Sequence, residues 1–106
     1  MSNYLGTDEA EIINEVLKEF VVAAKYSLAE VEAAVTNGCL ADIRAAAHGA
    51  KGEAVGAAAN KLGHLYSDME QLAREGNQTR FAELIILMAS AVDRIDAYVN
   101  RRMVKL

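Results

Sequence analysis

A histidine within a segment of small residues is the side chain of this sequence best placed to do chemistry. His48 lies near the middle of residues 44–56, and Lys51 and Gly52 follow it by three and four positions. On an α-helix those spacings put the three residues on one face. Histidine is also the side chain that changes charge and acts as a nucleophile near neutral pH. We therefore begin with the helix that must present His48.

A helical wheel divides this segment into two faces. At ~100° per residue, the residues within about 80° of His48 are Ala41, Arg44, Ala45, Lys51, Gly52, Val55 and Gly56. The more apolar stripe on the other side consists of Leu40, Ile43, Ala47, Ala50, Ala54 and Ala57. Because an apolar stripe faces a core, we expect His48 to face water. Glycines on that exposed face cost about 1 kcal/mol each relative to alanine, which favours a surface where another protein docks and His48 reacts.

The composition limits the fold and the partners. The chain has 106 residues, of which 53% are hydrophobic, and it has no proline and few aromatics, which indicates one all-α domain over residues 1–106. A formal net charge of −4 argues against nucleic acid as the main partner. The single Cys39 allows no internal disulfide and fits a reducing compartment. With neither a signal-peptide pattern nor a membrane span in the sequence, we expect a cytoplasmic protein that does not enter the membrane.

Apolar residues at helical spacing predict four helices with short connections. They cover roughly residues 8–36, 40–57, 61–74 and 80–99, after a short N-terminal lead-in over residues 1–6. Thr7 or Asp8 is the expected cap of the first helix, which could break once near residues 25–27. Turns are expected at Gly38, near residues 57–59 and at Gly76, and Asn77 or Thr79 is the expected cap of the last helix. The fold predicted is an antiparallel, up-down-up-down four-helix bundle with a short N-terminal helical lead-in.

The order of these residues resembles the histidine phosphotransfer (HPt) domain family. The family pattern is A-H-x-x-K-G, a leucine, then Leu-Glu and a basic turn. This chain has A-D-I-R-A-A-A-H-G-A-K-G-E-A, then Leu62, Met69-Glu70 and A-R-E-G-N, with no gap over residues 41–77. The preceding E-V-L-K-E-F and its helix extend the resemblance over nearly the whole chain. Departures at Gly49, Ala50 and Ala58 concern local packing and the turn, and they leave the histidine, lysine and glycine of the motif intact.

The resemblance implies a phosphorelay intermediate. His48 would accept a phosphoryl group on Nε2 from an aspartyl phosphate of one receiver domain and pass it to an aspartate of another. Lys51 would stabilise charge on the phosphoryl oxygens, and Gly52 would keep the surface low for the partner. Residues expected to contact that partner are Ala41, Arg44, Ala45, Val55 and Gly56.

The expected partners are response-regulator receiver domains and a (hybrid) sensor histidine kinase. We expect no cofactor of the chain's own, Mg²⁺ being held by the receiver, and a monomer. The residues leave two alternatives open: a helical interaction module that binds a receiver or kinase without being phosphorylated, and an oligomeric helical scaffold. His64 lies in the next helix among Leu62, Leu65 and Tyr66, and we do not expect it to be a second phosphorylated site or a metal ligand. Because the sequence has no glycine-rich phosphate loop, we expect a carrier without an ATP site rather than a kinase.

Overall fold

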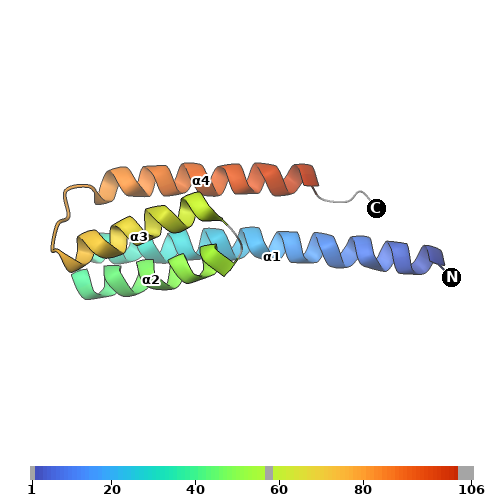
Figure 1. Ribbon diagram of the computed structural model, residues 1–106, viewed down its shortest axis with the longest axis horizontal. Coiled ribbons are helices and arrows are strands. Elements are labelled where there is room, and N and C mark those ends of the chain that lie inside the picture. The colour runs from blue at the N-terminus through green and yellow to red at the C-terminus, as the bar shows by residue number, and fades with distance from the viewer. Residues whose placement is uncertain (1, 57–58, 103–106) are drawn as a thin grey trace.

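The protein is an antiparallel four-helix bundle, as predicted from the sequence. The computed structural model describes residues 2–56 and 59–102, and no strand occurs in those ranges. Its helices are α1 (Ser2–Asn37), α2 (Leu40–Gly56), α3 (Asn60–Arg74) and α4 (Phe81–Arg102). Successive helices run up and down along one long axis (Figure 1). None of the described helices is long and apolar enough to cross a membrane.

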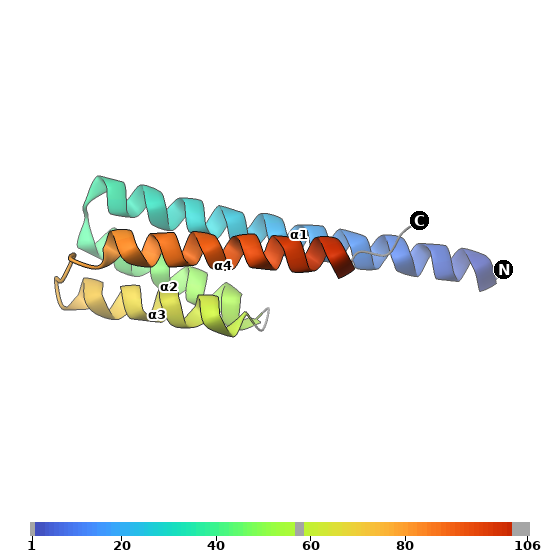
Figure 2. The same ribbon diagram turned by 90° about the horizontal axis from the view of Figure 1, so that it is seen from above.

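The four helices pack around a square. Within the described residues α2 lies between α1 and α3, α4 contacts α3 and α1, and no helix packs against the one across the diagonal. Two views at right angles show this arrangement, and they also show the N-terminal part of α1 running on beyond the ends of the other three helices (Figures 1 and 2). The molecule is therefore elongated, with extents of 59 × 21 × 19 Å.

The first helix differs from the expectation. Residues 2–6 of the expected lead-in are helical but continuous with the first helix, and the expectations of a cap at Thr7 or Asp8 and of a break near residues 25–27 were wrong, because α1 is one helix from Ser2 to Asn37. No proline interrupts this stretch. Around the expected break, Lys25 forms a 2.9 Å ion pair with Asp96 of α4 and Ser27 donates a hydrogen bond to Glu53 of α2. Neighbouring helices thus hold the backbone where local sequence suggested a weak point.

Two glycine turns are confirmed. Gly38 and Gly76 have φ values of +77° and +71°, a conformation open mainly to glycine. After α3, the Gly76 and Asn77 amides donate to the Ala73 and Leu72 carbonyls at 3.1 and 2.9 Å, which satisfies the last carbonyls of that helix. Asn77 does not cap α4, because its side chain instead accepts hydrogen bonds from Thr79 in the preceding loop. The expected turn residues Ala57 and Ala58 lie outside the described residues.

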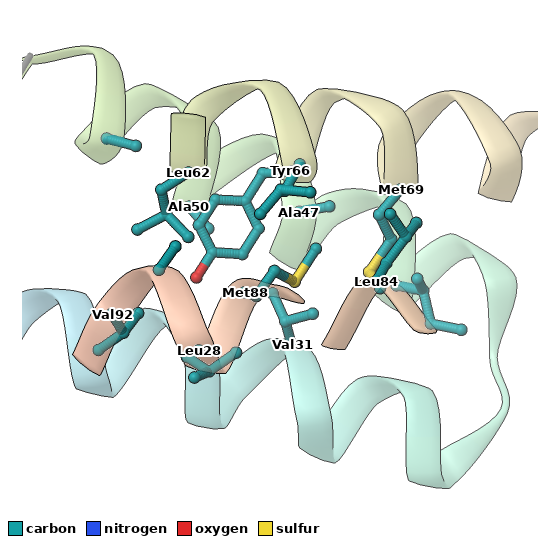
Figure 3. Packing of buried hydrophobic residues seen from close by; sticks show 14 of the residues in the cluster. Leu28, Val31, Ala47, Ala50, Leu62, Tyr66, Met69, Leu84, Met88 and Val92 are labelled. Carbon is teal, nitrogen blue, oxygen red and sulfur yellow. The ribbon is translucent and has the colours of Figure 1, made fainter. Parts of the chain in front are cut away.

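Small residues on α2 let the helices pack closely. Its buried residues are Ile43, Ala47, Ala50 and Ala54, as the apolar stripe predicted. Figure 3 shows the larger side chains of the core, including Tyr66 and Met69 of α3, gathered against α4 and the alanines of α2. Because alanine adds little bulk, α3 lies close enough to α2 for polar side chains on the two helices to meet at the surface.

Candidate functional site

His48 faces solvent from the middle of α2. The side chain is 69% exposed, whereas Ala47 and Ala50 beside it are buried. The expectation that the imidazole is presented outward, on the face opposite the core stripe, is therefore confirmed. The amphipathic pattern of α2 alone accounts for this orientation, because burying Ile43 and the alanines turns His48 away from the core.

A carboxylate of α3, that of Glu70, contacts three basic side chains, and His48 is one of them. Glu70 Oε2 lies 3.1 Å from His48 Nδ1, and Glu70 Oε1 lies 3.2 Å from Lys51 Nζ. Arg74, one turn further along α3, donates to the same Oε2 at 3.1 Å. The Glu70 side chain is only 8% exposed, so its position between the two helices is fixed by packing as well as by these contacts.

The charge of Glu70 is stabilised by its partners. Burial raises the pKa of the carboxyl, but the hydrogen bonds that Lys51 and His48 donate, together with the charge of Lys51, outweigh this effect and hold the pKa below its usual value of 4.5. Glu70 is thus an anion at neutral pH and can only accept hydrogen bonds. Both oxygens of the buried Glu70 carboxylate have a basic partner, and such pairing offsets the cost of removing a charge from water.

The contact with Glu70 determines which nitrogen of His48 is reactive. Since a carboxylate only accepts, the Nδ1 atom must carry the proton of their 3.1 Å hydrogen bond. In the neutral ring this leaves the lone pair on Nε2. Because the ring is largely exposed and Nδ1 is turned toward Glu70, Nε2 is the atom available to an incoming electrophile. The geometry corresponds to a histidine oriented by an acidic partner, as in nucleophilic sites generally.

No contact within the described chain requires glycine at the three glycine positions of α2. A Cβ atom built on Gly49, Gly52 or Gly56 would meet nothing within 4 Å. Gly49 and Gly52 lie inside α2, where glycine is about 1 kcal/mol less favourable than alanine, Gly56 is its last residue, and none of the three has a positive φ. Packing within the chain therefore does not select these glycines. A partner that approaches the backbone closely beside His48 would select them.

The other residues expected at the docking surface are exposed around His48. Ala41, Arg44, Ala45 and Gly56 are exposed, and Val55 is 64% exposed. Arg44 forms no ion pair with another described residue, so its charge is available to a partner. Lys51 is 34% exposed and is the least exposed of the predicted site residues, because its ammonium is drawn to Glu70.

Sequence reasoning missed the roles of Glu70 and Arg74. Glu70 was aligned with the family pattern but given no function, and Arg74 was seen only as part of a basic turn. A signal was present: Glu70 sits beside Met69 and near Tyr66 and Ala73 on the buried side of α3, where a carboxylate needs partners. His64 lies exposed on the same helix, away from this cluster. No group of three or more His, Cys, Asp or Glu side chains that could hold a metal ion occurs in residues 2–56 and 59–102.

Comparison with known proteins identifies the family. The profile of the Hpt domain family matches residues 15–98, which covers most of the chain and includes both α2 and α3. No curated protein and no solved structure matches the chain. The family is one of phosphotransfer carriers rather than kinases, and the exposed histidine with its buried carboxylate is consistent with it. The chain belongs to the Hpt domain family and is a histidine phosphotransfer domain.

Proposed function

We propose that this chain is a phosphorelay intermediate that carries the phosphoryl group on Nε2 of His48. The observation that supports this most directly is the hydrogen bond between His48 Nδ1 and the buried Glu70 carboxylate, with the ring 69% exposed. That contact keeps the proton on Nδ1 and the lone pair on Nε2. A partner's aspartyl phosphate then has an unobstructed nucleophile to meet.

The transfer step follows from this arrangement. The Nε2 lone pair attacks phosphorus, the bond from phosphorus to the aspartyl oxygen breaks, and the receiver's aspartate leaves as a carboxylate. The ring keeps its Nδ1 proton and becomes a phosphorylated imidazolium, whose positive charge Glu70 stabilises at 3.1 Å. Transfer to a second receiver reverses these steps. Lys51 would turn from Glu70 to the phosphoryl oxygens as negative charge develops there.

The surface around His48 fits a receiver domain as the partner. Gly52 and Gly56 keep the backbone accessible, Val55 offers an exposed apolar contact, and Arg44 and Lys51 suit an acidic active site. The Mg²⁺ ion needed for aspartyl phosphate chemistry would belong to the receiver. A sensor kinase, alone or as a hybrid with its own receiver, would supply the phosphoryl group upstream, and the relay would operate in the cytoplasm.

The test is phosphoryl transfer from an isotopically labelled phospho-receiver. The chain is expected to gain label that is stable in base and labile in acid, and His48→Gln is expected to abolish it. His64→Gln is the matched control, because His64 is also exposed on a helix but lies outside the Glu70 cluster. Label that persists in His48→Gln would overturn the proposal. A chain that binds the receiver without gaining label would instead be the non-phosphorylated interaction module.

A further inference from the structure

A cavity of about 300 Å³ lies between α1, α2 and α3. Its walls are mainly small or apolar side chains from the three helices, among them Ala24, Ala54 and Leu62. The lining residues Ala23 and Gly56 are exposed, so the cavity opens to solvent where the end of α2 meets α1. Protein interiors are close-packed and have few voids larger than a water molecule. The size of this space therefore needs an explanation beyond imperfect packing.

The Tyr66 hydroxyl is a buried polar group whose side chain lines this cavity. Tyr66 is 1% exposed, and its hydroxyl oxygen has no hydrogen-bond partner among the described residues. Figure 3 shows the ring reaching from α3 into the bundle, with the hydroxyl oxygen at its far end on the side of Leu28. The cavity residues Ala24 and Ser27 lie next to Leu28 on α1. Since a buried hydroxyl without a hydrogen bond is costly, this oxygen points to a ligand that would bind it.

Ser27 and Glu53 add hydrogen-bond acceptors to the wall of the cavity. Ser27 donates its hydroxyl proton to Glu53 Oε2, so Ser27 Oγ can only accept a further hydrogen bond. No basic side chain of the described residues forms an ion pair with Glu53. The Tyr66 hydroxyl can accept or donate. A ligand that supplies several hydrogen-bond donors therefore suits these three side chains.

The charged groups at the opening are mostly acidic. A neighbouring groove shares Ala23 and Glu53 with the cavity, and its other charged residues are Glu15, Glu19 and Lys18. Three carboxylates against one ammonium give this side of the protein a negative potential. Such a potential attracts a cation and disfavours an anion.

We propose that this cavity binds a small organic cation, an ammonium group carried on an apolar ring with a short chain. The ammonium supplies three donors, which the oxygens of Glu53, Ser27 and Tyr66 can accept. An apolar cavity of about 150 Å³ is enough to hold benzene, so the space of about 300 Å³ accommodates a ring and its chain.

This site is separate from the phosphotransfer surface. The cavity lies against Ala50 and Ala54, which are on the buried side of α2, whereas the His48 side chain is exposed on the opposite side. A ligand in the cavity would therefore leave His48 open to a receiver domain. The inference does not depend on the proposed phosphotransfer.

Binding of 2-phenylethylammonium to the full chain tests the site directly. In ¹H–¹⁵N NMR titrations at about pH 7, the amide shifts should saturate with a Kd of about 1 mM, as expected for a ligand of about nine non-hydrogen atoms. The largest shifts should come from residues around the cavity. 3-Phenylpropionate, which has a similar ring and chain but a carboxylate, should bind at least about tenfold more weakly because like charges repel. No saturable shifts, shifts confined to other surfaces, or equal binding of the two compounds would overturn the proposal.

Two pairs of variants separate the charge of the site from its space. Glu53→Gln keeps an acceptor for Ser27 but removes the charge, and it should weaken binding of 2-phenylethylammonium about tenfold. Asp42→Asn, also exposed on α2 but outside the cavity, should bind like the unaltered chain.

The second pair fills the space. Ala23→Leu should block the opening and abolish binding, whereas Ala29→Leu, at an exposed position of α1 that does not line the cavity, should not. All four changes are at exposed positions, and far-UV circular dichroism checks that each variant is folded. Unchanged binding in either Glu53→Gln or Ala23→Leu, or an equal loss in the matched control, would overturn the proposal.

Discussion

Removing the Glu70 carboxylate should slow phosphoryl transfer about tenfold while leaving the bundle folded. In Glu70→Ala the proton of His48 is no longer held on Nδ1, so the Nε2 lone pair is present in only part of the population. A hydrogen bond to a charged group contributes about 1.5–3 kcal/mol when buried. Because the His48 ring is 69% exposed, water replaces part of that contribution. About 1.4 kcal/mol remains, which corresponds to a factor of ten in rate.

The fold should tolerate this change. The three partners of Glu70 can turn to solvent, since the Lys51 and Arg74 side chains are 34% and 55% exposed and His48 more so. The loss of unfolding free energy should therefore be about 1 kcal/mol rather than the larger penalty of an orphaned buried charge. Far-UV circular dichroism and urea unfolding check this directly.

The assay is the initial rate of label transfer from a phosphorylated receiver domain. Glu75→Ala is the control, because Glu75 lies just past the end of α3 and, among the described residues, its side chain accepts a hydrogen bond only from exposed Gln71. ¹⁵N chemical shifts of the His48 ring report the cause: Nδ1 should be the protonated nitrogen in the unaltered chain and lose that preference in Glu70→Ala. A folded Glu70→Ala that transfers at the normal rate, with an unchanged ring tautomer, would refute the role assigned to Glu70.

Four further outcomes are expected. Because the folded-state pKa of Glu70 lies below 4.5, its charge stabilises the fold above pH 4.5, and this stabilisation is lost as the pH falls through the folded-state pKa. Between pH 7 and pH 3, the unfolding free energy measured in urea should therefore fall less in Glu70→Gln than in the unaltered chain. Equal decreases would contradict this. Gly52→Ala should raise the unfolding free energy by about 0.5–1 kcal/mol, whereas Gly52→Gln should fold and slow transfer about tenfold by blocking the partner; normal transfer by Gly52→Gln would remove the close-approach argument. Lys51→Ala should slow transfer about tenfold without unfolding, and an unchanged rate would make Lys51 an ordinary surface lysine. Burial and the nearby charges of Glu53 and Glu32 raise the pKa of Tyr66 to about 12, so the stability of the unaltered chain should fall as the pH rises above 10, and Tyr66→Phe should lack that loss. Tyr66→Phe should also be about 1 kcal/mol more stable at pH 7, because the buried hydroxyl has no hydrogen-bond partner among the described residues. A destabilised Tyr66→Phe would show that the hydroxyl does have a partner.

The length and continuity of α1 show where prediction from the local sequence failed. Residues 25–27 look like a break in sequence, yet Lys25 pairs with α4 and Ser27 bonds to α2, and these contacts come from far along the chain. Likewise Asn77 is one of the two caps expected for the last helix, but its side chain accepts a hydrogen bond from Thr79 in the loop instead. Such choices depend on which neighbour is within reach, and periodicity carries no information about that.

The sequence by itself determined the features that depend on near neighbours along the chain. The 3.6-residue period of α2 sets its buried stripe and therefore turns His48 outward, and the left-handed turns need Gly38 and Gly76. The tertiary structure alone decided that Glu70, 22 residues away, would meet His48. The two side chains meet only because the alanines of α2 let α3 pack close to it in one register. Neither helix specifies that packing by its own sequence.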